Sequence, residues 1–381
     1  MSSGSPHIPV IRSLAQLRRW RAAARERGLE VGVVPTMGAL HQGHLDLVKA
    51  SLARHPLTVM TLFVNPMQDL DKYPRTLESD LDLLRTLLPS GSRPLRGLGI
   101  SENDSFRPPH SETTTEPPVR GLGVSEDEGF RPAASHAGNR ADAPGAGVGS
   151  EFIPSSQTPL VVFNPAPDVM YPLKGELQDL TRHRGVSVDV RGYGDVMEGA
   201  SRPQFFRGVA TVCTKLFNAV EPDHAYFGQK DIQQALLLRI MLTDLLMAHP
   251  SPDHLHILPT TRAEDNLALS SRNAYLDPAE RAVAPVLHRA LSAARDLYTE
   301  GSTGEEMLAA ATQVVLDEQT RILDEKVPAE LKLDYFEVFD KDTFEPVRGE
   351  VKPGTPVVLA GAVWVGRTRL IDNLLLGWDI D

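Results

Sequence analysis

Apolar residues recur with two different periods along the first part of the chain. The short apolar runs 31–34 and 57–64 have the length of buried strands. Apolar positions spaced three and four apart predict helices over 45–53 and from Thr76 to Leu88. Because strands alternate with helices, the pattern predicts a parallel sheet with helices on both faces.

A helix is also expected before the first strand. Ser13 has the position of an N-cap, Gln16 completes a capping box, and Gly28 ends the apolar period. The surrounding arginines resemble a transit peptide in composition, but they also fit the polar face of this helix, which is the interpretation we favour. These arginines are Arg12, Arg18, Arg19, Arg21, Arg25 and Arg27.

The stretch 90–151 differs from its surroundings. It is rich in Gly, Pro, Ser, Arg and acidic residues, and it lacks apolar periodicity. Segment 96–109 recurs in similar form as 120–133, and neither copy could bury an apolar face. The composition predicts a disordered surface insertion. The alternative is a docking motif around Phe106 and Phe130.

The second half of the chain resumes the alternation and then changes. Further strands are predicted at 160–163, 186–190, 225–227 and 254–258, and helices at 209–220 and 232–247. From Asp277 to Gly301 a capped helix is expected, followed by a helix at 304–318 and strands at 331–339 and 356–365. We therefore expect an α/β domain over 8–258 and a smaller α+β domain over 259–381.

Composition limits the classes of function. The 381 residues carry a formal net charge of −11, which argues against a broad nucleic-acid-binding face but not against a local phosphate pocket. Apolar runs fall short of the roughly 18 residues that span a membrane. Cys213, the single cysteine, lies in an apolar helical pattern and is expected in the core. A chain without an intrachain disulfide fits a reducing compartment, so we expect a cytoplasmic location.

The first candidate site is the segment 35–44, between a predicted strand and a predicted helix. The carboxyl end of a strand is where open α/β sheets bind ligands, and free N–H groups at a helix start favour anions. Gly38 and Gly43 allow close backbone approach, and His41 and His44 could stabilise charge on a phosphate as imidazolium donors. The alternatives are two ordinary histidines, or a zinc pair, for which no third ligand is evident nearby.

The second candidate site, 225–234, repeats this arrangement of strand, glycine and helix. Lys230 is suited to phosphate oxygens, and Asp231 to a ribose or to the shell of a Mg²⁺ ion. Gln234 lies one turn beyond Lys230 and would reach the same opening. The alternative is a surface ion pair at the start of a helix.

Two further loops carry polar groups. Ser270, Ser271 and Arg272 could clamp phosphate oxygens, although a capped turn explains them equally well. Asn65 and Gln68 follow the second strand and could hydrogen-bond the hydroxyl groups of a small substrate.

Taken in order, these motifs resemble the pantoate–β-alanine ligase (pantothenate synthetase) family of the nucleotidylyltransferase superfamily. The matching segments are PTMGALHQGH, VNPMQ, DKYPRT, MYP at 170–172, the stretch 198–234, and ALSSRNAY at 268–275. The resemblance implies a Rossmann-like first domain, a C-terminal lid and a homodimer. It also implies ATP with Mg²⁺, attack of pantoate on ATP to give pantoyl adenylate, and transfer of the acyl group to β-alanine.

The resemblance also assigns roles to residues. His41, His44, Lys230 and Arg272 would be catalytic, with His44 as general acid. Gln68 and Gln234 would hold pantoate, Asn65 would assist them, and Gln68 would also lie near β-alanine. The ATP site would comprise Met37, Gly38, Ala39, Leu40, His41, Gln42, Gly43, His44, Gly228, Gln229, Lys230, Asp231, Thr261, Leu269, Ser270, Ser271 and Arg272.

The chain departs from the family pattern in two places. Gln68 runs directly into Asp69, so a loop beside the expected pantoate site is shortened, and Gln204-Phe205 replaces the common Gly-His. Two alternatives therefore stay open. One is a nucleotidylyltransferase that acts on a phosphate-containing acceptor, and the other is an impaired homologue that only binds nucleotide.

Overall fold

The computed structural model describes residues 5–67, 73–94, 98, 157–173, 176–177 and 182–380. Gln68 lies outside these residues, as does most of the expected insertion 90–151. Arg93–Pro94 (β4) pairs in parallel with Gln157–Thr158 (β5), so the two sides of the insertion lie next to each other.

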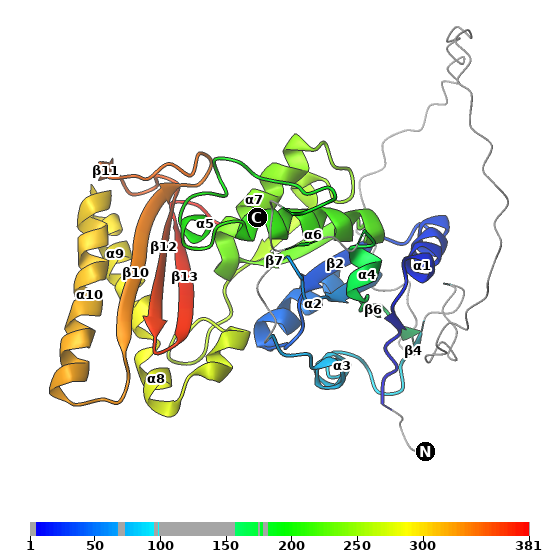
Figure 1. Ribbon diagram of the computed structural model, residues 1–381, viewed down its shortest axis with the longest axis horizontal. Helices are drawn as coiled ribbons and strands as arrows, with labels where there is room; N and C mark the ends of the chain where they lie inside the picture. Colours follow the sequence, from blue (N-terminus) through cyan, green and yellow to red (C-terminus); the bar gives the residue numbers. More distant parts are fainter. Residues whose placement is uncertain are drawn as a thin grey trace, which may run out of the picture.

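A six-stranded parallel sheet forms the first domain (Figure 1), as the alternation of strands and helices predicts. Its strand order is β1-β6-β3-β2-β7-β8. The strands are β1 (Val10–Ile11), β2 (Val31–Thr36), β3 (Leu57–Leu62), β6 (Leu160–Phe163), β7 (His224–Gly228) and β8 (Leu255–Leu258).

Successive residues of each strand point into two separate cores. Val33 packs with the helices on one face, whereas Val34 packs with those on the other. The first face is covered by α1 (Leu14–Glu26), α6 (Phe205–Val220) and α7 (Ile232–Asp244), the second by α2 (Gln42–Arg54) and α3 (Leu77–Arg85). Burial on both faces explains why the strands are continuous apolar runs in the sequence.

Two expectations for this domain are wrong. Residues 186–190 form no strand, because the Val188 N–H donates to Thr211 Oγ1 at 2.9 Å and Val186 is exposed. Arg21 does not lie on the polar face of α1. It is 4% exposed and forms an ion pair with Asp223 at 2.9 Å.

A three-stranded antiparallel sheet, β10 (Leu331–Asp340), β12 (Val357–Val365) and β13 (Thr368–Leu376), forms the second domain. Helices α9 (Val286–Glu300) and α10 (Gly304–Asp324) cover its outer side (Figure 1). The helix expected from Asp277 to Gly301 is divided at Pro285 into α8 (Pro278–Val283) and α9, because proline lacks the N–H that a continuous helix needs. The predicted capping box at Asp277 is confirmed.

The inner side of this sheet packs on the first domain. Arg369 of β13 donates two hydrogen bonds to Glu198, at 2.6 and 2.9 Å, and Glu198 lies on the short helix α5 (Glu198–Ser201). Tyr335 of β10 donates to the same carboxylate at 3.0 Å. This buried network fixes the second domain over the carboxyl edge of the parallel sheet.

Within the described residues, none of the helices combines the length and the apolar character needed to cross a bilayer.

Candidate active site

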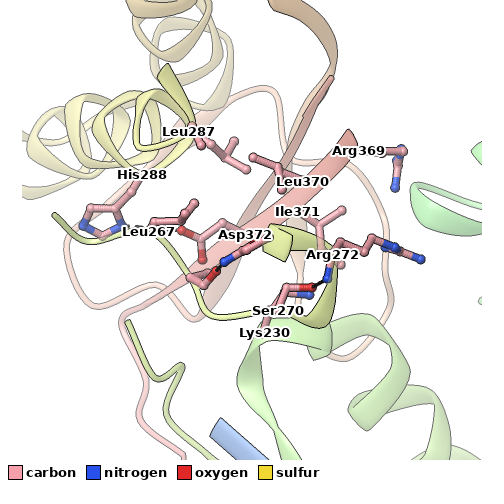
Figure 2. A pocket seen from close by; sticks show the side chains of 13 residues that line it. Lys230, Leu267, Ser270, Arg272, Leu287, His288, Arg369, Leu370, Ile371 and Asp372 are labelled. Atoms are coloured by element: carbon pink, nitrogen blue, oxygen red, sulfur yellow. Dashed lines mark hydrogen bonds and ion pairs between the residues drawn. The ribbon is translucent and has the colours of Figure 1, made fainter. Parts of the chain in front are cut away.

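The predicted site segments meet at the carboxyl ends of β2 and β7, next to the sheet of the second domain. A cleft of about 340 Å³ is lined by Lys230, by Ser270 and Arg272 of the following loop, and by Arg369 and Asp372 of β13 (Figure 2). Segments far apart in the sequence thus contribute to one cavity, as the predicted arrangement of strand ends requires.

The loop that follows β2 is held by Asp80 of α3. Asp80 is 2% exposed and accepts hydrogen bonds from the backbone N–H groups of Ala39, at 3.1 Å, and Leu40, at 2.8 Å. Ala39 has a φ of 50°, a conformation that few non-glycine residues adopt without supporting bonds. These two N–H groups of the loop before α2 are therefore occupied by a carboxylate of the protein and are not available to an anion.

The side chains of His41 and His44 both accept backbone hydrogen bonds within the turn that begins α2. His41 Nδ1 accepts from the Gly43 N–H at 3.2 Å, and His44 Nδ1 accepts from the His41 N–H at 3.3 Å. In a neutral imidazole whose Nδ1 accepts, the proton resides on Nε2. Each ring therefore has an Nε2–H as its remaining donor.

Both histidines are uncharged at neutral pH. Burial, followed by the charge of Lys230, lowers the pKa of His41 to about 4. Burial, followed by the charges of His41 and Lys230, lowers the pKa of His44 to about 3. The expected imidazolium donors are thus corrected to neutral N–H donors in the free protein. A bound polyphosphate would raise both pKa values, since nearby negative charge favours the protonated ring.

Lys230 stands on the turn η2 (Gln229–Asp231) between β7 and α7. Its side chain is 16% exposed and lies 3.7 Å from the Asp231 carboxylate. Asn373 of β13 fixes this turn, because its amide donates to the carbonyls of Gln229 and Lys230 at 2.9 and 3.0 Å. The charge of Lys230 lowers the pKa of both His41 and His44, so the ammonium lies within electrostatic range of the two rings.

Tyr73 joins the histidine loop to the loop of Arg272. Its hydroxyl donates to the Gly38 carbonyl at 3.0 Å and lies 3.4 Å from Ser271 Oγ. Ser270 caps the turn η4 (Ser271–Tyr275) by accepting from the Arg272 N–H, which confirms the predicted capped turn without removing Arg272 from the cleft. The three distant segments predicted to converge do so.

A second cleft of about 430 Å³ opens on the other side of Lys230. Arg202 and Gln234 line it together with Phe205 and Phe339. Burial, followed by the charge of Arg272, lowers the pKa of Arg202 to about 10. The Arg202 guanidinium is 3.6 Å from the centre of the Phe205 ring, which takes the place of the family's histidine.

Other predicted residues have partners within the protein. Asn65 is buried, donates to the Gly208 carbonyl at 3.0 Å and accepts from the Tyr171 hydroxyl at 2.8 Å. These bonds hold Asn65 against α6 and Tyr171 at the end of β3. Thr261 donates to Asp46 at 2.9 Å and packs beside Gly43, at the first turn of α2.

Sequence reasoning missed Asp80, Tyr73, Asn373 and Arg202 as site residues. Asp80 is one of three acidic residues in or near the first turn of α3, and no local pattern separates it from Glu78 or Asp82.

Gln204, which replaces a glycine of the family pattern, has a strained backbone conformation. This residue has a φ of 70°, where the family's glycine would be unstrained and another residue costs about 1–2 kcal/mol.

The fold and the site together define a nucleotide-binding α/β enzyme with a histidine pair at the carboxyl edge of its sheet. The family model described as pantoate-beta-alanine ligase matches residues 9–90 and 148–375. The chain therefore belongs to the pantoate–β-alanine ligase family. The family model leaves residues 91–147 unmatched.

Individual relatives match this chain along nearly its whole length. The pantothenate synthetase of Moorella thermoacetica is 37% identical over 376 residues, which cover 97% of this chain and 99% of the relative. The crystal structure of pantothenate synthetase from Thermus thermophilus is 31% identical, covers 96% of this chain and 99% of its own, and superposes with a TM-score of 0.64. The Francisella tularensis pantoate-beta-alanine ligase, at 21% identity and a TM-score of 0.59, shares the fold.

Proposed function

We propose that this protein condenses (R)-pantoate with β-alanine in an ATP-dependent reaction that passes through pantoyl adenylate and releases AMP and pyrophosphate. The observation that carries the proposal is the meeting of three distant segments in a chain of this family. Lys230 and Arg272 line one cleft, Tyr73 links the loop of Arg272 to the loop of the two histidines, and the charge of Lys230 acts on both histidine rings. The Francisella ligase, whose structure was solved in complex with beta-gamma ATP and β-alanine, supports the choice of substrates.

In the first half-reaction, a carboxylate oxygen of pantoate attacks the α-phosphorus of ATP and pyrophosphate leaves. Negative charge builds on the phosphate oxygens, so the site needs positive groups and N–H donors that are already in place. Lys230 and Arg272 supply the charge, and the Nε2–H groups of His41 and His44 supply donors. The ATP contacts proposed for Met37–His44, Gly228–Asp231, Thr261 and Leu269–Arg272 follow from the family resemblance.

In the second half-reaction, the β-alanine amine attacks the acyl carbon and AMP leaves. The second cleft is suited to the acyl group, because Phe205, Phe206 and Phe339 offer apolar surface to the two methyl groups of pantoate. Gln234 lines the same cleft and would bind a hydroxyl group. Gln68, at the shortened loop, remains the candidate for contacts with both pantoate and β-alanine.

The residues also fit a magnesium ion that enters with ATP. Asp231 is half-exposed, lies 3.7 Å from the Lys230 ammonium and lines the second cleft, so one carboxylate is available beside the phosphate-binding lysine. Mg²⁺ in nucleotide sites is usually held by one or two carboxylates, by phosphates and by water, and it neutralises phosphate charge. Asp231 would therefore hold such an ion directly or through water. A homodimer and a cytoplasmic location stay predictions from the family resemblance, and sedimentation and fractionation would test them.

The direct test is a product assay with ATP, Mg²⁺, pantoate and β-alanine, in which each component is omitted in turn. AMP and pantothenate should form only in the complete mixture. His44→Ala and Lys230→Ala should each lower turnover by about 10²–10³-fold, the usual effect of losing one preorganised donor. The exposed residues His254 and Lys49, changed to alanine, serve as matched controls and should leave turnover unchanged.

Each alternative has its own outcome. Turnover that needs a phosphorylated acceptor and no amine would identify a nucleotidylyltransferase. Calorimetric binding of ATP without pantoate-dependent release of pyrophosphate would identify a homologue that only binds nucleotide. A normal rate in either the His44 or the Lys230 variant would remove that residue from the mechanism.

A further inference from the structure

A second cluster of histidines lies at the opposite edge of the parallel sheet. His55 ends α2, His224 begins β7, and His256 is the second residue of β8. One ring nitrogen from each lies within 4.8 Å of the others. These residues stand at the amino ends of the strands, so they belong to no part of the ATP site described above.

Close packing brings the three rings together. Gly32 of β2 has no side chain where α2 ends, and a Cβ there would collide with Ser51 Oγ and lie 3.1 Å from the His55 ring. The rings of His55 and His224 stack with their centres 4.1 Å apart. His224 Nδ1 and His256 Nε2 are 3.0 Å apart. The backbone, and not a flexible loop, therefore sets the spacing.

Glu30, which directly precedes β2, bonds to one of these rings and lies near a second. Its Oε2 atom is 3.4 Å from His55 Nδ1 and 4.0 Å from His224 Nε2. A carboxylate that accepts from one ring nitrogen leaves the other nitrogen with a lone pair, which is the usual support of metal-bound histidine. His55 Nε2, which contacts the Tyr226 hydroxyl at 2.7 Å, is thereby left as an acceptor, whereas the contact of Glu30 with His224 is too long for a hydrogen bond.

We propose that His55 Nε2, His224 Nδ1 and His256 Nε2 bind one Zn²⁺ ion, with water in the fourth position. Two nitrogens on a tetrahedral zinc lie about 3.3 Å apart, since each Zn–N bond is about 2.0–2.1 Å. The pair His224–His256 already has this separation within a few tenths of an ångström. His55 needs a shift of roughly 1–1.5 Å, away from the Tyr226 hydroxyl, to complete the site.

The charges around the cluster permit a cation. Arg54 and Arg239 face it as positive groups, and Glu30 and Asp223 as negative ones, so they offset each other. Burial is the largest cause that lowers the pKa of each of the three histidines to about 4. The rings are therefore neutral at pH 7, the state in which imidazole binds zinc.

Such an ion would join the end of α2 to β7 and β8. The histidine pair lies at the start of α2, and Lys230 lies in the turn that follows β7. The site is expected to stabilise the fold without contacting any substrate. Its test is therefore independent of the proposed ligase activity, because metal binding can be measured without turnover.

The test is equilibrium dialysis of the full chain, freed of metal by a chelator, against buffered Zn²⁺ with metal analysis. One zinc per chain should bind, and a His41→Ala/His44→Ala double variant should still bind it. His224→Ala and His256→Ala should each weaken binding by at least about 100-fold, whereas His254→Ala should change it less than about threefold. His254 is the matched control, since its exposed ring lies 4.2 Å from the His224 ring centre but outside the ligand set.

Circular dichroism checks that each variant folds. If a variant does not fold, crystals of the unaltered chain grown with Zn²⁺ decide the question at the zinc absorption edge. An anomalous peak between the three rings supports the site. No bound zinc, equal affinity in the His256 variant, or a peak only at His41 and His44 overturns it.

Discussion

Asp80→Asn tests how the histidine loop is positioned. The Asp80 carboxylate holds the backbone of Ala39 and Leu40 through two different oxygens and also accepts from the Thr76 hydroxyl at 3.1 Å. Asparagine has the same shape but only one acceptor oxygen, so its NH₂ group must face one of the two N–H donors. Either orientation removes one hydrogen bond to a charged group, which contributes about 1.5–3 kcal/mol.

We expect the free energy of unfolding to fall by about 1.5–3 kcal/mol and kcat/KM for ATP to fall by about 10- to 100-fold. The kinetic effect follows because the loop carries His41 and His44, and a displacement near 1 Å is enough to disturb the reacting geometry. Denaturant unfolding, followed by the fluorescence of the buried Trp20, measures the first quantity, and the product assay measures the second.

Asp82→Asn is the matched control. Asp82 lies on the same helix, its side chain is 73% exposed, and it pairs with Arg85. This variant should leave both quantities close to those of the unaltered protein. A loss of stability in Asp80→Asn with normal kcat/KM would refute the positioning role, and normal values of both would refute the whole argument.

Two further predictions concern stability. Arg21→Met should lower the free energy of unfolding by about 3–5 kcal/mol and leave kcat/KM unchanged, because the Asp223 carboxylate loses its buried partner. Urea unfolding measures the loss, and the exposed residue Arg19, changed to Met, is the control. Equal stability of the two variants would contradict the prediction. Stability should also fall as pH drops from about 6.5 toward 4. The folded pKa of His41 and His44 lies below that of the unfolded chain, so the unfolded state binds more protons in this window. The slope of unfolding free energy against pH should be smaller in His44→Asn, and an unchanged slope would show that His44 does not contribute.

Local sequence patterns were sufficient for much of the fold. The N-cap at Ser13, the capping box at Asp277, the apolar runs of the parallel strands and the helix stripe of α6 each depend on neighbours in the chain, and the structure confirms them. The strand predicted at 186–190 was wrong, because alternation within a short segment does not show whether a sheet edge is available to pair with it.

For the candidate site, too, some properties could be predicted from the sequence and others depended on the tertiary structure. The sequence by itself determined that the candidate histidines and Lys230 lie at one edge of the sheet, since both segments directly follow strands that run parallel. Only the tertiary structure decided the charge state of His41 and His44 and the roles of Asp80, Tyr73 and Asn373. Those properties depend on burial and on partners distant in sequence, as in the hydrogen bond from Asn373 to the Lys230 carbonyl. A local sequence pattern cannot predict them.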